Sequence, residues 1–266
     1  MPLIQLIVLA IIQGITEFLP VSSSAHLILA PLLVENWQDQ GPLIDVAAHV
    51  GSLFAVIAFF RRETGMLTHG AIDTVMMRDS ENRRLLFHVV LATLPILFVG
   101  GIVAVGGWLD DLRSPRIIGS AFIVFGVLLW HGDRQDQPKT ELRAMTWRDA
   151  LAVGLAQIIA IIPGSSRSGV TMTAARYLGW SRTQAARFSM LVAIPTIGAS
   201  GLFAVMSLIS DGAQASMMAA LIVAVLSFFS ALAAIAVFMK MTKTMSFTPF
   251  VIYRIVVGLF LLFYFS

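Results

Sequence analysis

The sequence predicts an all-α polytopic membrane protein that is built from two repeats of inverted topology. Three observations support this fold class: a mean hydropathy of +0.85, apolar runs long enough to cross a bilayer, and two proline-broken polar segments that repeat one order of elements. Of the 266 residues, 58% are hydrophobic and 12% are charged. Because soluble domains carry about 25% charged residues, this composition excludes a soluble fold.

Charge and cysteine content exclude several function classes. The formal net charge is +3, but the basic residues lie in short loops between apolar runs, so we expect no nucleic-acid partner. The chain contains no cysteine, which excludes disulfide bonds, thiolate catalysis and cysteine-bound metals. The first residues lack a basic region and lead into a polar motif, so we expect no cleaved signal peptide.

Six apolar runs are long enough to span a hydrocarbon core of about 30 Å, since each helical residue adds about 1.5 Å. We therefore predict transmembrane helices over residues 44–61, 84–107, 115–131, 186–208, 215–239 and 249–265.

Two further apolar regions, 3–34 and 147–178, are interrupted near their middles by Pro20 and Pro163. Each arm then has about 15 residues, or about 22 Å of helix, which is too short for a full crossing. We predict that each region is a re-entrant helical hairpin, a form that is tolerated where protein or a polar cavity covers the turn.

Residues 1–131 and 132–266 thus share a plan of one hairpin followed by three transmembrane helices. The similarity extends past the hairpins, because Gly-Ser-Leu-Phe-Ala-Val at 51–56 matches Ser-Gly-Leu-Phe-Ala-Val at 200–205. Three crossings is an odd number, so the second half is inverted relative to the first. We predict a single integral membrane domain made of these two repeats.

Lysine and arginine collect in cytoplasmic loops, so their positions predict the topology. Four basic segments fall on one side of the predicted membrane: 61–84, 131–148, 176–187 and 240–243. The opposite side receives only Arg113 and Arg116. We therefore predict that both termini lie on the non-cytoplasmic side.

Inversion makes the hairpins enter from opposite faces, so their tips can meet within the membrane. Each second arm starts a helix at a serine cluster, and helix starts offer unpaired N–H groups to an anion. Arg167 adds a planar, permanently charged group suited to phosphate oxygens. We expect a phosphorylated substrate, with capping or packing as the alternative role of the individual serines. The candidate phosphate-binding residues are Ser22, Ser24, Gly164, Ser165, Ser166, Arg167, Ser168 and Thr171.

The first hairpin carries the candidate catalytic groups. Gln13 and Glu17 are four residues apart, so they share a helix face, and Glu17 can act as a general base or bind a divalent cation. Ser23 and His26 are three apart and form a minimal pair for an activated nucleophile or an activated water. For both Glu17 and His26, a purely structural role is the alternative.

Two other ionisable residues lie inside predicted spans. His49 lies near the outer end of its helix, and we expect it to be structural. For Arg254, a structural pair and a role at the site are equally consistent with the sequence.

Together these residues resemble the undecaprenyl-diphosphate phosphatase family of bacteria, also known as bacitracin-resistance proteins. The resemblance covers nearly the whole chain and rests on two motifs. The first is Glu/Gln-x-x-x-Glu followed by Pro-x-Ser-Ser-x-x-His, and the second is Pro-Gly-x-Ser-Arg-Ser-Gly-x-Thr. Their positions here are Gln13, Glu17, Pro20, Ser22, Ser23 and His26, and then Pro163, Gly164, Ser166, Arg167, Ser168, Gly169 and Thr171.

The resemblance implies hydrolysis of the C55 isoprenoid diphosphate to its monophosphate, which recycles the lipid carrier of peptidoglycan and cell-wall synthesis in the bacterial plasma (inner) membrane. It further implies Mg²⁺ or Ca²⁺ as cofactor, an essential acid at Glu17, phosphate binding by Arg167 and a nucleophile at Ser23. Gln13 stands where many members have a first acid, which leaves Glu17 as the main acidic metal ligand. Ser23, His26 and a water remain the candidate nucleophiles.

The alternative functions and the packing of four glycines stay open at the level of sequence. Inverted repeats with broken helices also describe secondary transporters and lipid flippases, which are the main alternative function. A second class of membrane lipid phosphatases is disfavoured, because it requires a histidine where this chain has Thr173. The glycines at 100, 101, 106 and 107 allow close helix packing either within the chain or in a homodimer.

Overall fold

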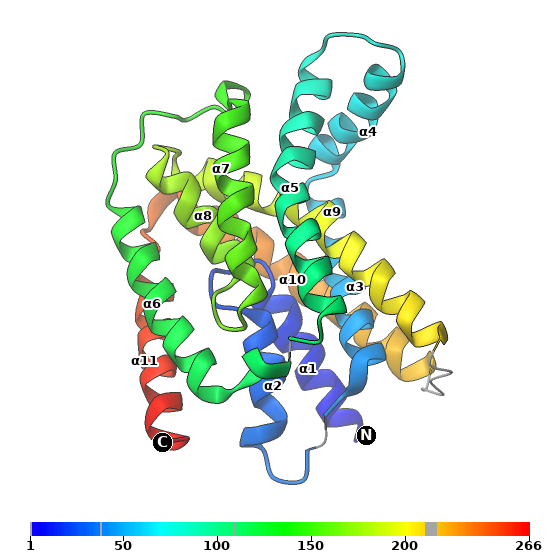
Figure 1. Cartoon of the computed structure of the whole chain (residues 1–266), viewed down its shortest axis with the longest axis vertical. Helices are drawn as coiled ribbons and strands as arrows, with labels where there is room; N and C mark the ends of the chain where they lie inside the picture. The colour runs from blue at the N-terminus through cyan, green and yellow to red at the C-terminus, as the bar shows by residue number, and fades with distance from the viewer. Residues whose placement is uncertain (1, 38, 109, 211–216) are drawn as a thin grey trace.

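The computed structural model describes residues 2–37, 39–108, 110–210 and 217–266, and their regular secondary structure is helical (Figure 1). The first half contains α1 (Leu3–Thr16), α2 (Ser23–Leu33), α3 (Gly41–Phe59), α4 (Arg61–Val75), α5 (Glu81–Val105) and α6 (Pro115–Asp133). The second half contains α7 (Trp147–Gln157), α8 (Arg167–Tyr177), α9 (Arg182–Ser210), α10 (Met217–Thr244) and α11 (Thr248–Tyr264). Short 3₁₀ helices cover Asp110–Arg113, Leu142–Ala144 and Ile158–Ile161.

Among the described residues, five helices are long and apolar enough to cross a membrane: α3, α5, α6, α9 and α10. They correspond to five of the six predicted spans, although residues 215 and 216 of one prediction lie outside the described residues. The sixth prediction, 249–265, coincides with α11, which is apolar but has only 17 residues. Large apolar side chains such as Phe98 and Phe263 face outward, at 72% and 78% exposure. The chain is therefore a polytopic membrane protein.

Helix α4 lies within residues 61–84, which the sequence predicts to be a loop. It follows α3 directly at Phe60 and has few apolar residues, so it gave no membrane signal. It packs on α5 where Gly70 lies against the backbone of Asn82. In Figure 1, α4 and the start of α5 extend beyond the other helices, at the end opposite the two termini.

Both predicted helix breaks are present. Helix α1 ends at Thr16 and α2 begins at Ser23, while α8 begins at Arg167 after a short 3₁₀ turn that follows α7. Ser22 and Ser166, the residues just before α2 and α8, have φ angles of 72° and 70°. Non-glycine residues rarely adopt this left-handed region. The two breaks thus share one unusual backbone geometry.

The helices of the two halves pack against each other in a reciprocal pattern. Helix α3 contacts α9, and α6 contacts α11. The first arm of each hairpin packs on a helix of the other half, so that α1 lies against α10 and α7 lies against α5. The main hydrophobic core includes residues of both halves, such as Phe18, Val56, Phe188 and Phe238. This packing holds the two hairpins in one body.

Glycines allow these arms to approach closely. A Cβ added to Gly14 of α1 would overlap Ser230 Oγ and lie 2.7 Å from the backbone nitrogen of Ala231 on α10. A Cβ added to Gly154 of α7 would lie 2.7 Å from the carbonyl oxygen of Ala92 on α5. Small residues permit such backbone contact between membrane helices.

We predict that Gly14→Ala lowers the stability of the protein in detergent by about 1–3 kcal/mol, because the added methyl group has no space. Gly198→Ala on α9 is the matched control, since its Cβ meets nothing within 4 Å and alanine favours helix by up to about 1 kcal/mol. Thermal unfolding of both purified variants measures the effect. Equal melting temperatures for the two variants would contradict the packing described here.

Candidate active site

The two hairpin tips present different side chains from equivalent positions. Ser23 is the first residue of α2 and Arg167 is the first residue of α8. Each follows a serine with positive φ, and both side chains reach Glu17 of the first hairpin. The tips are joined directly, because Gly164 donates its N–H to Ser22 Oγ at 3.1 Å and Ser168 Oγ donates to the Leu19 carbonyl at 2.8 Å.

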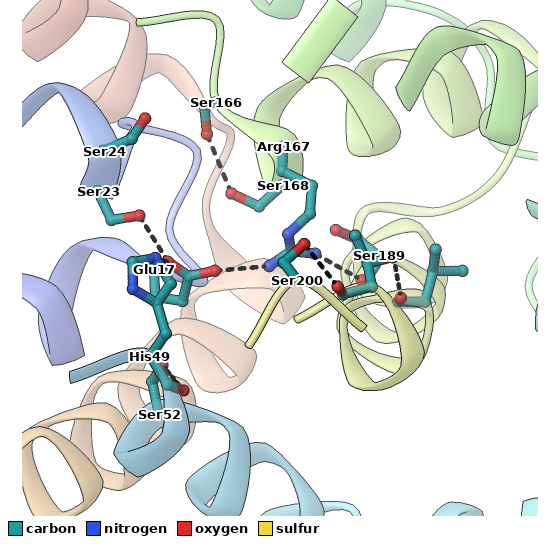
Figure 2. Close-up of polar contacts among 12 residues, drawn as sticks. Glu17, Ser23, Ser24, His49, Ser52, Ser166, Arg167, Ser168, Ser189 and Ser200 are labelled. Carbon is teal, nitrogen blue, oxygen red and sulfur yellow. Dashed lines mark hydrogen bonds and ion pairs between the residues drawn. The ribbon is translucent and has the colours of Figure 1, made fainter. Parts of the chain in front are cut away.

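Glu17 lies between the hairpins and contacts both (Figure 2). Ser23 Oγ donates a hydrogen bond to Glu17 Oε2 at 2.5 Å, and Gln13 Nε2 donates to the same oxygen at 2.9 Å. Arg167 Nη2 donates to Glu17 Oε1 at 3.2 Å, which makes an ion pair. His49 Nε2 lies 3.7 Å from Oε2. Glu17 is only 7% exposed, and its carboxylate is therefore surrounded by groups from four helices, α1, α2, α3 and α8.

Arg167 is also held from its other side. Its Nη1 donates to the Ser189 carbonyl of α9 at 3.3 Å, and Thr171 on α8 bonds to the Ser189 hydroxyl at 2.8 Å. This arrangement directs the guanidinium toward Glu17 (Figure 2). A planar guanidinium fixed in this way suits a phosphate group.

Glu17, Ser23, His49 and Arg167 line a cavity of about 610 Å³. Its volume is within the range of ligand sites, about 300–1,000 Å³. The rest of its wall is mostly apolar and comes from α5 and α9. The polar residues that line it are Glu17, Ser22, Ser23, Ser24, Asp45, His49, Ser166, Arg167, Thr196 and Ser200.

Comparison with known proteins assigns the chain to a family. Residues 6–260 match the family model of the bacitracin resistance protein BacA. The chain belongs to the BacA family. Proteins named undecaprenyl-diphosphatase from Maricaulis maris and Alteromonas mediterranea are 49% and 41% identical to it, over 99–100% of both chains. Undecaprenyl-diphosphatase 2 of Stutzerimonas stutzeri is 45% identical, over 100% of this chain and 99% of the relative.

In this BacA-family chain, four of the candidate phosphate-binding residues do not line this cavity. Gly164 and Ser168 use their polar groups to join the two tips. Ser165 Oγ donates to the Ile162 carbonyl at 2.7 Å, and Thr171 Oγ1 donates to the Arg167 carbonyl at 2.8 Å. These four residues stabilise the turn that carries Arg167. Ser22, Ser24, Ser166 and Arg167 remain at the cavity.

His26 is also placed differently from the expectation. Its Nδ1 contacts the Ser22 carbonyl oxygen at 2.7 Å, and its Nε2 contacts the Tyr253 hydroxyl at 2.5 Å, so the ring lies between α2 and α11. Ser23 and His26 do not point in the same direction from α2, because three residues rotate a helix by about 300°, which is less than a full turn. The imidazole near Glu17 is instead that of His49, for which the sequence predicts a structural role. Its signal in the sequence was an ionisable group inside an apolar helix.

The structure explains Arg254 as an internal clamp. Its guanidinium is fully buried and contacts no carboxylate among the described residues. It donates hydrogen bonds at 2.8–3.3 Å to the carbonyl oxygens of Pro20, Ala121, Phe122, Gly164 and Ser165. Arg254 therefore ties both hairpin tips to α6. This structural role is made through backbone carbonyl groups, whereas the structural alternative from the sequence was a pair.

The residues near Glu17 supply few metal ligands. Within the described residues, no group of three or more His, Cys, Asp or Glu side chains could hold a metal ion. Gln13 points its amide nitrogen at Glu17, while its buried Oε1 has no hydrogen-bond partner. This donor set fits a cation only if substrate oxygens and water complete the coordination, which is how Mg²⁺ is commonly bound.

We predict that Arg254→Lys lowers the melting temperature by several degrees and reduces activity, because one ammonium cannot replace a fork that bonds five carbonyl groups. Arg84→Lys is the control, since Arg84 forms an exposed pair with Asp79 outside the core, and exposed pairs contribute about 0–1 kcal/mol. Thermal unfolding in detergent distinguishes the two. Full stability of the Arg254 variant would show that the tips do not depend on this clamp.

Proposed function

We propose that this chain hydrolyses undecaprenyl diphosphate to undecaprenyl phosphate and inorganic phosphate. The observation that carries the proposal is the contact of Ser23 and Arg167 with one buried carboxylate, Glu17, at the polar end of an otherwise apolar cavity. Full-length relatives at 41–49% identity carry the name undecaprenyl-diphosphatase. This reaction recycles the lipid carrier of peptidoglycan synthesis, which accounts for resistance to bacitracin.

Ser23 is the nucleophile of this mechanism. Its Oγ attacks the terminal phosphorus, and its proton passes to Glu17 Oε2, which lies 2.5 Å away. The bond from that phosphorus to the bridging oxygen breaks, and the departing lipid monophosphate takes the proton from Glu17. Glu17 then deprotonates the water that hydrolyses the phosphoserine, and the proton returns to Ser23 Oγ. His26 supports the hairpin through Ser22 and Tyr253.

Arg167 and the two helix starts bind the diphosphate. Ser22, Ser24 and Ser166 line the same cavity as Arg167. Unpaired N–H groups at helix starts and a guanidinium neutralise the charge that develops in phosphoryl transfer. A divalent cation, Mg²⁺ or Ca²⁺, would be held by Glu17 together with diphosphate oxygens and water. When bound, it neutralises further negative charge on the substrate.

The fold proposed for this function is the inverted repeat of 1–131 and 132–266, with hairpins 3–34 and 147–178. Two observations support it. The first arm of each hairpin packs on a helix of the other half, and Ser22 and Ser166 have similar positive φ angles. In this arrangement α11 is the sixth crossing. Its 17 residues extend over about 25 Å, and a short span is accommodated by local thinning of the bilayer.

In this topology both termini lie on the non-cytoplasmic side of the plasma membrane. The basic loops 61–84 and 131–148 then lie in the cytoplasm. The cavity is lined by the start of α3 and by the ends of α5 and α9, which all lie toward the non-cytoplasmic side. The diphosphate group therefore enters from that side, while the lipid tail stays in the bilayer.

We predict that purified protein in detergent releases phosphate from undecaprenyl diphosphate. Ser23→Ala abolishes this release, and Glu17→Gln lowers kcat by about 10²–10⁴-fold, because the general base is lost. Ser52→Ala is the matched serine control, since Ser52 Oγ bonds to the His49 carbonyl of its own helix. A malachite-green assay measures the rates.

Each outcome of this assay has a definite meaning. Release by the unmodified protein in detergent requires an enzyme, since a transporter or flippase would release no phosphate there. Substantial activity of Ser23→Ala would make water the nucleophile. No release by the unmodified protein would overturn the proposed function.

The absence of cysteine allows a direct test of the topology. We predict that Ser266→Cys reacts with a membrane-impermeant maleimide in intact spheroplasts, because the C-terminus lies outside the cytoplasm. Asp136→Cys, in the loop between α6 and α7, should react only after lysis. The reverse labelling pattern would place the termini in the cytoplasm.

A further inference from the structure

The cavity around Glu17 and Arg167 continues away from the polar groups as a groove between α5 and α9. On α5 the groove is lined by Leu97, Gly100, Gly101 and Ala104, and on α9 by Gly201 and Ala204. Within each helix these positions recur at spacings of three or four, so each set lies on one helix face. We call this region the α5–α9 groove.

The glycines of the groove do not serve close helix packing. A Cβ added to Gly100, Gly101 or Gly201 would meet nothing within 4 Å. At Gly51, by contrast, an added Cβ would overlap the backbone of Ala224 on α10. The glycines of the groove therefore leave space open beside the cavity.

The groove is mostly apolar, although Thr196 and Ser200 of α9 also line the cavity, and it opens to the surface of the protein. No charged residue of α5 or α9 lines it within the described residues. Gly101 is exposed, and Phe203 beside the groove is 60% exposed. In a membrane protein, this surface faces lipid. The groove thus connects the polar end of the cavity with the hydrocarbon phase.

We propose that the α5–α9 groove holds the first isoprene units of the substrate's tail and determines which lipid diphosphates reach Glu17 and Arg167. The proposal rests on the proposed function and assigns the tail of that substrate. An isoprenoid chain carries a methyl branch on every unit. The open space beside Gly100, Gly101 and Gly201 accommodates such branches, which a wall of larger side chains would exclude.

Single cysteines test this assignment, since the chain has no other cysteine. Gly101→Cys and Gly201→Cys place a thiol in the groove. Each variant is folded and purified first, and its thiol is modified only afterwards. Gly198→Cys is the matched control, because it lies on α9, its Cβ also meets nothing within 4 Å, and it does not line the cavity. Each purified variant is treated with N-benzylmaleimide, and phosphate release from undecaprenyl diphosphate is measured.

We expect modification at positions 101 and 201 to lower kcat/KM by about tenfold or more, the effect of blocking a hydrophobic subsite, and the modified control to keep its activity. Farnesyl methylenebisphosphonate, which carries three isoprene units, should slow the modification at 101 and 201. Methylenebisphosphonate without a tail should not slow it.

Two outcomes would overturn the assignment. One is equal activity of the modified variants and the modified control, and the other is equal protection by the two bisphosphonates. Both are read against unmodified protein that hydrolyses the substrate, so they exclude the groove and leave the proposed function standing. Failure of the unmodified protein to release phosphate would instead reject the proposed function.

Discussion

The ion pair between Glu17 and Arg167 is the interaction on which the organisation of this protein depends. It joins two chain segments that are 150 residues apart, at a depth where the surrounding surface is apolar. A buried charge without a partner is strongly destabilising, so each hairpin supplies what the other needs. The same pair brings Ser23 and the guanidinium of Arg167 to one carboxylate. The contact that stabilises the hairpins therefore also assembles the candidate site.

Broken helices inside a membrane leave backbone groups that water cannot satisfy. Here the protein satisfies them internally. Arg254 donates to carbonyl groups of both tips, and Ser22 accepts the Gly164 N–H. Several serines and threonines that look like ligands for phosphate, including Ser165, are used in this way. Ser22 and Ser166 both accept a backbone N–H and also line the cavity, whereas Ser165 does not line it.

The two hairpins have the same backbone at their tips but different chemistry. Ser22 and Ser166 both have a positive φ angle, and the residue that follows starts a helix in both cases. In the first hairpin that residue is Ser23, and in the second it is Arg167. One repeated geometry thus supplies a hydroxyl from one side and a cation from the other, and the acid between them comes from the end of α1.

The sequence by itself determined the helical membrane fold and the two breaks, and it singled out Glu17, Ser23 and Arg167 as candidates, because hydropathy, proline and intramembrane polar groups are local signals. It did not reveal α4, whose sequence has little apolar character, and it left the role of Arg254 undecided. Only the tertiary structure decided which polar groups face the cavity. It placed His49 beside Glu17, turned His26 toward Tyr253 and showed open space at Gly101 and Gly201. These outcomes depend on contacts between helices distant in sequence, which no local pattern encodes.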